Sequence, residues 1–466
     1  MRYIERKREA LKVVLNKHSS LLGVLFGSVL VSISLGPYCN WDSLLEYAAA
    51  SGVVKWGLPY ITFGNLINEP PFGYYVDAFF FKTFGLSYEV GVGVITLFGL
   101  GCVFLVYEIG KILYGERTGL LAAALFVLTP WHVVMSRVFL ADVQCLFFSL
   151  LYLLVGIWAI RKGSLKILFA SGVIFGVALL TKLFALFMLI PLSLIYIHWR
   201  PKNPKRALEG IVLFFLPAFL LQLLWYQFLS GRGMLSLFGH DDFNHLIPKG
   251  IVPPYFFLFS FFVQNPGLFL LLASVFSLLL SFSKRKFFAR ILAFDLIFLA
   301  TIIGVAGLNM YLVLGRNLLV PYVDPIKYDY PLLPLFCWLA ASLANKCYLL
   351  FSQQSFKGKH HKLIFSIVMI GLFLLVASMI VNLKNLNWST RTGFLFFRAE
   401  GGLGYSLFSL SPVMGISSFE ILSPIGIARI NYLETIQDLA FILIVIILLR
   451  ANRDKFEQLR ALFKAT

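Results

Sequence analysis

The feature that most constrains this chain is a series of about twelve apolar runs separated by polar segments. The runs lie at residues 21–36, 90–111, 118–135, 139–160, 166–181, 183–199, 209–229, 258–282, 291–314, 331–352, 363–382 and 436–450. Most approach the length that a helix needs to cross ~30 Å of hydrocarbon. With 59% hydrophobic and 13% charged residues among 466, the chain carries more apolar surface than a water-soluble domain can bury. The sequence therefore predicts an all-α polytopic membrane protein.

The net charge of +18 is distributed in a way that indicates membrane topology. When residues 1–19 are placed inside and the runs alternate, most of the 40 Lys and Arg residues fall on the inner side, including those in 284–290 and 450–466. This is the positive-inside bias of membrane proteins. It predicts a multi-pass protein of the plasma membrane with both termini in the cytoplasm. No nucleic-acid partner is needed, because this charge orients helices and attracts anionic lipids.

The longer polar segments divide the chain into three parts. Residues 1–382 form a transmembrane bundle that includes a large first outer loop, 37–89. Residues 383–435 form a small outer segment, and residues 436–466 contain the last span and a cytoplasmic tail. The inner loops are short, so no cytosolic nucleotide-binding module fits. The five Cys residues form no Cys-x-x-Cys pair, which argues against a zinc site.

The first outer loop is predicted to hold two helices that lie at the membrane surface. Asn40 is a suitable N-cap for a helix from Trp41 to about Ala50, and Ser51-Gly52 would end it. A second amphipathic helix is predicted to begin at Pro70-Pro71. The first helix places Asp42 in its first turn, where the helix dipole favours an ionised carboxylate.

Ionisable residues gather at the predicted outer edge of the membrane, where they are functional candidates by default. A carboxylate can take a proton from an attacking hydroxyl, and Arg or Lys can hold a phosphate. Structural alternatives exist: Asp42 could cap a helix, Arg137 and Asp142 could pair at a turn, and Lys182 could snorkel to the headgroups. The acidic and basic candidates are Asp42, Glu46, Glu69, Arg137, Asp142, Lys182, Arg316 and Lys327.

Several segments of the chain, in a fixed order, carry a family resemblance. They are Asp42, Glu69-Pro70-Pro71-Phe72-Gly73-Tyr74-Tyr75, Phe84-Gly85-Leu86-Ser87, Tyr114-Gly115-Glu116-Arg117-Thr118-Gly119-Leu120-Leu121-Ala122-Ala123, the set Pro130, Ser136, Arg137 and Asp142, then Gly176-Val177-Ala178-Leu179-Leu180-Thr181-Lys182, and Lys327-Tyr328-Asp329-Tyr330-Pro331-Leu332-Leu333-Pro334. With these segments the chain resembles the GT-C superfamily of membrane glycosyltransferases. The branch that it resembles most contains the protein O-mannosyltransferases and the aminoarabinose transferase of lipid A. The resemblance covers residues 37–185 and a block near 316–336.

The resemblance implies a GT-C-like bundle of about 12–13 transmembrane helices. It implies an inverting glycosyltransferase that moves a sugar from a polyprenyl-phosphate carrier to a hydroxyl acceptor on a protein, lipid or glycan, at the outer face of the membrane. Asp42 would be the general base, and Asp142 would orient the acceptor or the sugar. The residues that would bind the donor phosphate or the substrate are Arg137, Lys182, Lys327, Tyr328, Arg316, Glu69, Tyr74 and Glu46.

Two positions depart from the family pattern. Ser43 follows Asp42 where many members have Glu, so the second acidic role would fall to Glu46, Glu69 or Asp142. Glu69 stands where lipid A-type members often carry a Lys that contacts phosphate. Phosphate binding would then fall to the basic candidates named above.

Metal dependence divides the superfamily. By resemblance, the protein mannosyltransferase branch works without a metal, whereas the oligosaccharyltransferase branch holds a divalent cation on acidic residues. Asp42, Glu69 and Asp142 would hold Mg²⁺ or Mn²⁺ only if they converge, and no other cofactor is expected. Two rival functions stay open. They are a secondary transporter with carboxylates as proton relays, and a polymerase or ligase that uses lipid-diphosphate glycans.

Replacing Asp42 by Asn tests the role of this carboxylate as the general base. The amide keeps the size of the side chain and loses its capacity to take a proton. We therefore expect sugar transfer to fall ~10²–10⁴-fold while the protein still folds. Turnover of a polyprenyl-phosphate sugar by the purified protein measures the effect. Full activity in this variant would remove the catalytic role.

Overall fold

The computed structural model describes residues 20–21, 23–29, 41–62, 64–67, 69–199, 203–230, 267–313, 330–352, 394–397 and 410–412. Within these residues helices dominate, and strands occur as two short antiparallel pairs. One pair joins β1 (Tyr60–Thr62) to β2 (Asn65–Leu66), and the other joins β3 (Phe394–Phe397) to β4 (Leu410–Pro412). The predicted all-α class is confirmed. The second pair falls in the predicted outer segment 383–435, and the division into three parts stays a prediction.

Among the described residues, four helices are long and apolar enough to cross a membrane. They are α4 (Tyr88–Tyr114), α7 (Ala141–Lys162), α10 (Pro204–Ser230) and α14 (Arg285–Val313). Each overlaps a run that the sequence predicts as a span. The predicted runs at 363–382 and 436–450 lie outside the described residues.

Shorter helices occupy most of the other predicted runs. They are α8 (Leu165–Leu179), the 3-10 helix η1 (Leu183–Met188), α9 (Leu189–His198), α13 (Gly267–Ser283), the 3-10 helix η2 (Tyr330–Leu332) and α16 (Leu333–Ser352). Residues 20–21 and 23–29 are also helical and fall in the first predicted run.

The predicted run 118–135 is not one helix. It begins as α5 (Glu116–Leu128), breaks at Thr129 with φ −73° and ψ 119°, and resumes as α6 (Pro130–Met135). Proline explains the break, because its ring disfavours the helical conformation in the preceding residue. The prediction of a single span is therefore wrong here. The turn after α6 carries the chain to the start of α7.

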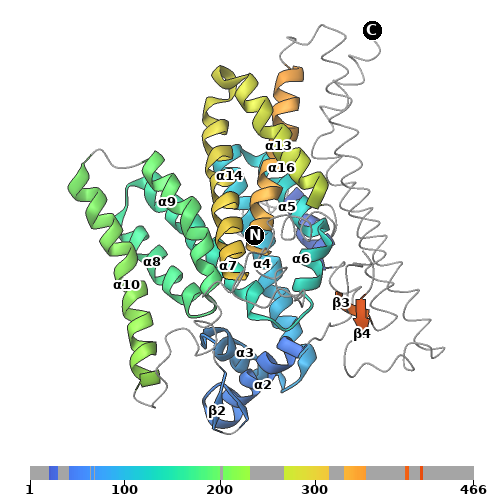
Figure 1. Cartoon of the computed structure of the whole chain (residues 1–466), viewed down its shortest axis with the longest axis vertical. Coiled ribbons are helices and arrows are strands. Elements are labelled where there is room, and N and C mark those ends of the chain that lie inside the picture. The colour runs from blue at the N-terminus through green and yellow to red at the C-terminus, as the bar shows by residue number, and fades with distance from the viewer. Residues whose placement is uncertain are drawn as a thin grey trace, which may run out of the picture.

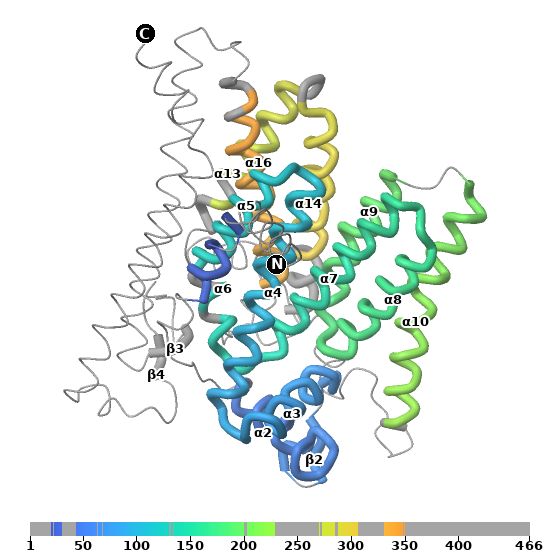
Figure 2. The backbone as a smooth tube through the Cα atoms, turned by 180° about the vertical axis from the view of Figure 1, so that it is seen from behind, coloured from blue at the N-terminus to red at the C-terminus, as the bar shows by residue number. Residues whose placement is uncertain are grey.

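Small residues let the helices of the bundle pack closely. A Cβ at Gly110 would lie 2.9 Å from the Cα of Gly119, so α4 and α5 touch through their backbones. A Cβ at Gly172 would clash with the carbonyl oxygen of Phe214, which brings α8 directly onto α10. Figure 1 shows α4, α5, α14 and α16 near the centre of the bundle, with α8, α9 and α10 grouped beside them. Figure 2 shows the same grouping from behind.

The first outer loop contains the two predicted helices, but the first is longer than expected. α2 extends over Trp41–Trp56, whereas the sequence predicts an end near Ala50. Ser51 does not end the helix, because its hydroxyl donates to the carbonyl oxygen of Tyr47 at 2.7 Å, within the helix. The predicted end is therefore wrong by about one and a half helical turns.

Two glycines shape the actual end of α2. A Cβ at Gly52 would clash with the carbonyl oxygen of Tyr60, so glycine here lets β1 lie against the helix. The helix stops before Gly57, whose φ of 77° is readily adopted by glycine. The second helix, α3 (Phe72–Phe84), begins directly after Pro70-Pro71, as predicted. Figures 1 and 2 show α2 and α3 together at one end of the bundle.

A buried ion pair connects four helices near the C-terminal end of α4. Asp295 of α14 pairs with Lys346 of α16, and both side chains are fully buried. The hydroxyls of Tyr114 and Ser281 donate to the Asp295 carboxylate at 3.1 and 3.0 Å. Lys346 also donates to the hydroxyl of Ser277 at 2.7 Å. These contacts link α4, α13, α14 and α16, which gives Asp295 a structural role that its sequence position alone does not assign.

Breaking this pair on one side should destabilise the bundle. Replacing Lys346 by Met leaves the Asp295 carboxylate buried without its cation, which costs about 3–5 kcal/mol of unfolding free energy. Adding Asp295→Asn removes the orphaned charge, so the double variant should recover much of the loss. Thermal unfolding in detergent measures both proteins. A single variant as stable as the wild type would contradict the structural role.

Candidate active site

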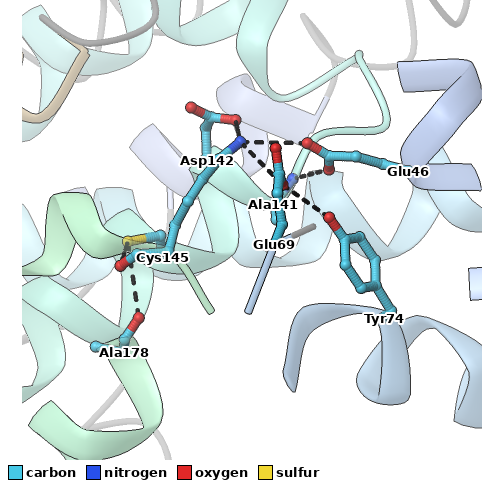
Figure 3. A network of polar contacts seen from close by, with 8 residues as sticks. Glu46, Glu69, Tyr74, Ala141, Asp142, Cys145 and Ala178 are labelled. Atoms are coloured by element: carbon cyan, nitrogen blue, oxygen red, sulfur yellow. Dashed lines mark hydrogen bonds and ion pairs between the residues drawn. The ribbon is translucent and has the colours of Figure 1, made fainter. Parts of the chain in front are cut away.

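Lys182 lies at the junction of α8 and η1, with its side chain 9% exposed. Its ammonium nitrogen lies 2.7 Å from Oδ2 of Asp142, 3.2 Å from Oε1 of Glu46 and 3.9 Å from Oε2 of Glu69. The backbone N–H of Lys182 donates to the carbonyl oxygen of Ala178, so the last turn of α8 holds the residue in place. Figure 3 shows the three carboxylates converging from separate segments. We call these four side chains the Lys182 cluster.

The carboxylates also determine the charge of the lysine. Burial alone would lower the pKa of Lys182, but Asp142, Glu46 and Glu69 raise it well above its usual range. The ammonium therefore stays protonated. Lys182 does not snorkel to the headgroups, because its side chain ends among buried acids. Four of the predicted site residues are thus brought together by the fold.

Asp142 occupies the first turn of α7, where the helix dipole stabilises its negative charge. Lys182 holds one of its oxygens, Oδ2. The other oxygen, Oδ1, is buried and has no hydrogen-bond partner among the described residues. A buried carboxylate oxygen normally accepts a hydrogen bond, so Oδ1 is suited to receive a hydroxyl from a substrate.

Glu46 reaches from α2 to the start of α7. Its Oε2 accepts a hydrogen bond of 2.6 Å from the backbone N–H of Ala141. The residue at the N-cap position, Leu140, has no side-chain oxygen to do this, so Glu46 caps α7 from a distant part of the chain. Burial raises the pKa of Glu46 to about 8, and Glu69 and Asp142 add to this rise, although Lys182 opposes it.

Glu69 is the most exposed acid of the cluster, with 35% of its side chain accessible. The hydroxyl of Tyr74 donates to its Oε2 at 2.8 Å. Burial, together with the nearby Glu69 charge, raises the pKa of Tyr74 well above its usual range, so this hydroxyl stays a donor. Phe72, at the start of α3, donates its backbone N–H to the carbonyl oxygen of Leu180 at 2.9 Å. This contact keeps Glu69 beside Lys182.

Asp42 lies in the first turn of α2, where the sequence places it. It precedes Glu46 by four residues, and residues at this spacing share one face of a helix. The α2 backbone thus puts Asp42 on the side that carries Glu46 into the Lys182 cluster. The side chain of Asp42 lies outside what the structure describes, and its role as a base stays a prediction.

Arg137 lies in the turn between α6 and α7 and is half-buried. Its Nη1 donates to the hydroxyl of Thr96 at 3.2 Å. The alternative of an ion pair with Asp142 does not hold, because Asp142 pairs with Lys182 instead. The remaining predicted residues, which lie outside the described part of the chain, are Arg316, Lys327 and Tyr328.

A second polar contact beside the cluster was not predicted. Nε2 of Gln144, in α7, donates to Oδ1 of Asp77, in α3, at 2.7 Å, and both side chains are buried. Burial, followed by the nearby Glu46 charge, raises the pKa of Asp77 well above its usual range. Gly73 allows this contact, because a Cβ there would lie 2.5 Å from Oε1 of Gln144. A lone carboxylate in the apolar segment Phe72–Phe84 was the signal that could have found it.

The acidic residues do not form a metal site among the residues that the structure describes. Those residues contain no group of three or more His, Cys, Asp and Glu side chains arranged to hold a metal ion. Glu69 and Asp142 do converge, but they converge on the Lys182 ammonium, which would repel a divalent cation. The predicted Mg²⁺ or Mn²⁺ stays untested, because its third ligand is the Asp42 side chain.

Comparison with known sequences finds one family across the first half of the bundle. The model of the dolichyl-phosphate-mannose-protein mannosyltransferase family matches residues 68–225. Two Bacillus subtilis (strain 168) proteins with mannosyltransferase names, YkcB and YycA, are 31% identical over 133 residues and 28% identical over 130 residues. Each match covers 28% of this chain, and the matches cover 18% and 19% of these relatives.

Comparison with solved structures extends the likeness over most of the chain. ArnT from Cupriavidus metallidurans in the apo state has a TM-score of 0.53 at 15% identity, with 93% of this chain and 77% of that chain covered. ArnT bound to undecaprenyl phosphate has a TM-score of 0.51 at 16% identity, with 92% and 76% covered. The apo oligosaccharyltransferase of Archaeoglobus fulgidus has a TM-score of 0.54 at 12% identity, with 90% and 60% covered. At these identities the likeness shows a shared fold.

Removing the central cation should make folding depend on pH. In Lys182→Met, Glu46 and Asp142 stay buried without a cation, which costs about 3–5 kcal/mol near pH 8. Glu46, whose pKa burial raises to about 8, binds more protons in the folded protein than in the unfolded chain. The variant should therefore gain stability as the pH falls from 8 toward 5. Melting temperatures in detergent across this pH range measure the effect.

Lys111→Met provides the matched control for this experiment. Lys111 pairs with Glu108 at 3.2 Å, as Lys182 does with Glu46, but the Lys111 and Glu108 side chains are 33% and 17% exposed. The control should change stability by less than about 1 kcal/mol at any pH. A Lys182→Met protein that behaves like this control would show that the cluster is not held by its cation.

Proposed function

The chain is a polytopic membrane protein with the GT-C fold of membrane glycosyltransferases, and on that premise we propose that it is a polyprenyl-phosphate-sugar-dependent glycosyltransferase. It transfers a sugar to a hydroxyl acceptor at the outer face of the membrane. The donor class is supported by the fold shared with ArnT bound to undecaprenyl phosphate and by the dolichyl-phosphate-mannose name of the matching family. The acceptor is a protein, lipid or glycan.

The observation that carries this proposal is the Lys182 cluster itself. The reaction needs a cation for the phosphate that leaves and an acceptor for the proton of the attacking hydroxyl. The cluster supplies a buried ammonium with Asp142 at 2.7 Å, and the buried Oδ1 of Asp142 has no hydrogen-bond partner among the described residues. Glu46 of α2 and Glu69, just before α3, reach the ammonium and Asp142 from the first outer loop (Figure 3).

The proposed reaction is one displacement. The hydroxyl oxygen of the acceptor attacks the anomeric carbon of the sugar, and the bond from that carbon to the phosphate oxygen breaks. The hydroxyl proton passes to the carboxylate of Asp42. The phosphate oxygen leaves with the bonding electrons, so the lipid phosphate gains one negative charge. The configuration at the anomeric carbon inverts.

The residues of the cluster divide these tasks. Asp142 orients the hydroxyl through its unpaired oxygen, Oδ1, while Lys182, with Arg137 and Lys327, stabilises the charge on the leaving phosphate. Glu69 forms the partly exposed edge of the cluster, where a sugar hydroxyl can bind, and the buried Tyr74 holds it by a hydrogen bond. The other proposed contacts to the substrate or donor phosphate are Glu46, Arg316 and Tyr328.

A turnover assay with purified protein in liposomes tests the function. We expect release of polyprenyl phosphate from a radiolabelled polyprenyl-phosphate sugar when an acceptor is present. Asp142→Asn should slow release by about 10²-fold, because the hydroxyl loses its orienting oxygen. Glu108→Gln, far from the cluster, should retain the wild-type rate.

The same preparation separates the rival functions. A secondary transporter would show proton-coupled uptake into the vesicles with no release of lipid phosphate. A lipid-diphosphate glycan ligase would release lipid diphosphate from its own donor and leave the monophosphate sugar intact. Either result in place of monophosphate-sugar turnover would overturn the proposed function.

A further inference from the structure

The charges of the Lys182 cluster do not balance. One ammonium faces three carboxylates, and the side chains of Glu46 and Asp142 are 4% and 2% exposed. If all three acids were ionised, two negative charges would remain beside the place where a lipid phosphate must bind. Buried charges without partners are strongly unfavourable, and a phosphate anion would add to the repulsion. Among the described side chains, protonation of one of these acids would relieve that repulsion when the phosphate binds.

Geometry selects Glu46 as the acid that holds this proton. Asp142 has the shorter contact with Lys182, 2.7 Å against 3.2 Å, and it lies in the first turn of α7, beside the positive end of the helix dipole. Glu69 is 35% exposed, so water still solvates its charge. Glu46 is buried, so water does not solvate its charge, and it lies farther from Lys182 than Asp142 does.

Among the described residues, the titratable groups that face Glu46 are Lys182 at the α8–η1 junction, Asp142 in α7, Glu69 just before α3, and Tyr74 and Asp77 in α3. Asp42 lies one turn earlier on the same face of α2. The pKa of Glu46 is raised to about 8: burial is the largest cause, the charge of Lys182 opposes it, and the charges of Glu69 and Asp142 add to it. Near neutral pH the side chain is thus mostly a neutral acid.

We propose that Glu46 is a positioning residue whose protonation releases the charge of Lys182 to the phosphate of the lipid carrier. This inference rests on the proposed function. When Glu46 is neutral, the Lys182 ammonium interacts with Asp142 and with the phosphate that binds. Ionised Glu46, 3.2 Å away, competes with the phosphate for the same cation and repels it. Binding of the donor is therefore linked to proton uptake by Glu46.

The hydrogen bond to α7 lets the charge change without moving the helix. Oε2 of Glu46 accepts from the N–H of Ala141 at 2.6 Å. A carbonyl oxygen of the neutral acid accepts this bond equally, and so does the amide oxygen of Gln. Glu46→Gln consequently keeps the cap on α7 and fixes position 46 in the neutral state. A purely structural Glu46 would give this variant no altered pH dependence.

Binding of a diester probe across pH tests the proposal. The probe is a short-chain polyprenyl methyl phosphate, whose single negative charge does not titrate between pH 6.5 and 9.5. Its Kd for the purified wild-type protein should rise about tenfold between pH 7 and pH 9, as a group with a pKa near 8 loses its proton. Glu46→Gln should bind the probe tightly and equally at both pH values.

Glu108→Gln is the matched control, because Glu108 also lies 3.2 Å from a lysine but outside the cluster. This control should keep the rise in Kd seen in the wild type. A wild-type Kd that is flat with pH overturns the inference and leaves the proposed function standing. The same holds if Glu46→Gln keeps the wild-type slope or binds weakly at every pH. Failure of the wild type to bind the probe at any pH overturns the proposed function as well.

A measurement on the wild type alone covers the case in which Glu46→Gln does not fold. In weakly buffered solution at pH 9, binding of the probe should take up close to one proton, about 0.9 per bound molecule. The control probe is the matching uncharged polyprenol, which should take up none. Probe binding without proton uptake would overturn the inference.

Discussion

The buried ammonium of Lys182 is the interaction on which the rest of the site depends. A lysine at this depth is stable only with carboxylate partners, and its partners come from segments far apart in the chain. Glu46 comes from the first outer loop, Asp142 from the start of a membrane span, and Glu69 from the segment before α3. These ion pairs thus add polar contacts to the apolar packing that holds α2 and the segment before α3 against the bundle.

The two carboxylate oxygens of Glu46 make different contacts, one with a helix terminus and one with the central cation of the cluster. One carboxylate oxygen caps α7, whose own N-cap residue, Leu140, has no group for the task, and the other contacts Lys182. The start of α7 also carries Asp142, so the oxygen atom that caps the helix also positions a carboxylate of the Lys182 cluster. A displacement of α2 would therefore remove the cap of α7 and also separate the side chains of the Lys182 cluster.

The sequence predicts those features that depend on local pattern, and it misses those that depend on packing across the chain. Apolar runs locate the spans, and Pro70-Pro71 marks the start of α3, because these signals act on neighbouring residues. The sequence also names four members of the Lys182 cluster by placing charged residues on one membrane face. It does not predict that Glu46 caps Ala141, or that Asp77 meets Gln144, since these contacts join residues 95 and 67 positions apart. The same long separation hides the pairing of Asp295 with Lys346.

The two buried lysines, Lys182 and Lys346, differ in the balance of charge around them. α4 spans ~40 Å, and its ends contact the two regions: Tyr88 bonds Ser43 of α2, near the cluster, while Tyr114 bonds Asp295. At the Asp295 end, Lys346 meets one carboxylate, and hydroxyl groups complete the shell. That set is electrically neutral, so it needs no further ligand. At the Lys182 end, three carboxylates face one ammonium among the described residues, and ionisable groups arranged in this way are candidates for a functional site. The balance of charge thus distinguishes the proposed active site from the neutral pair at Asp295.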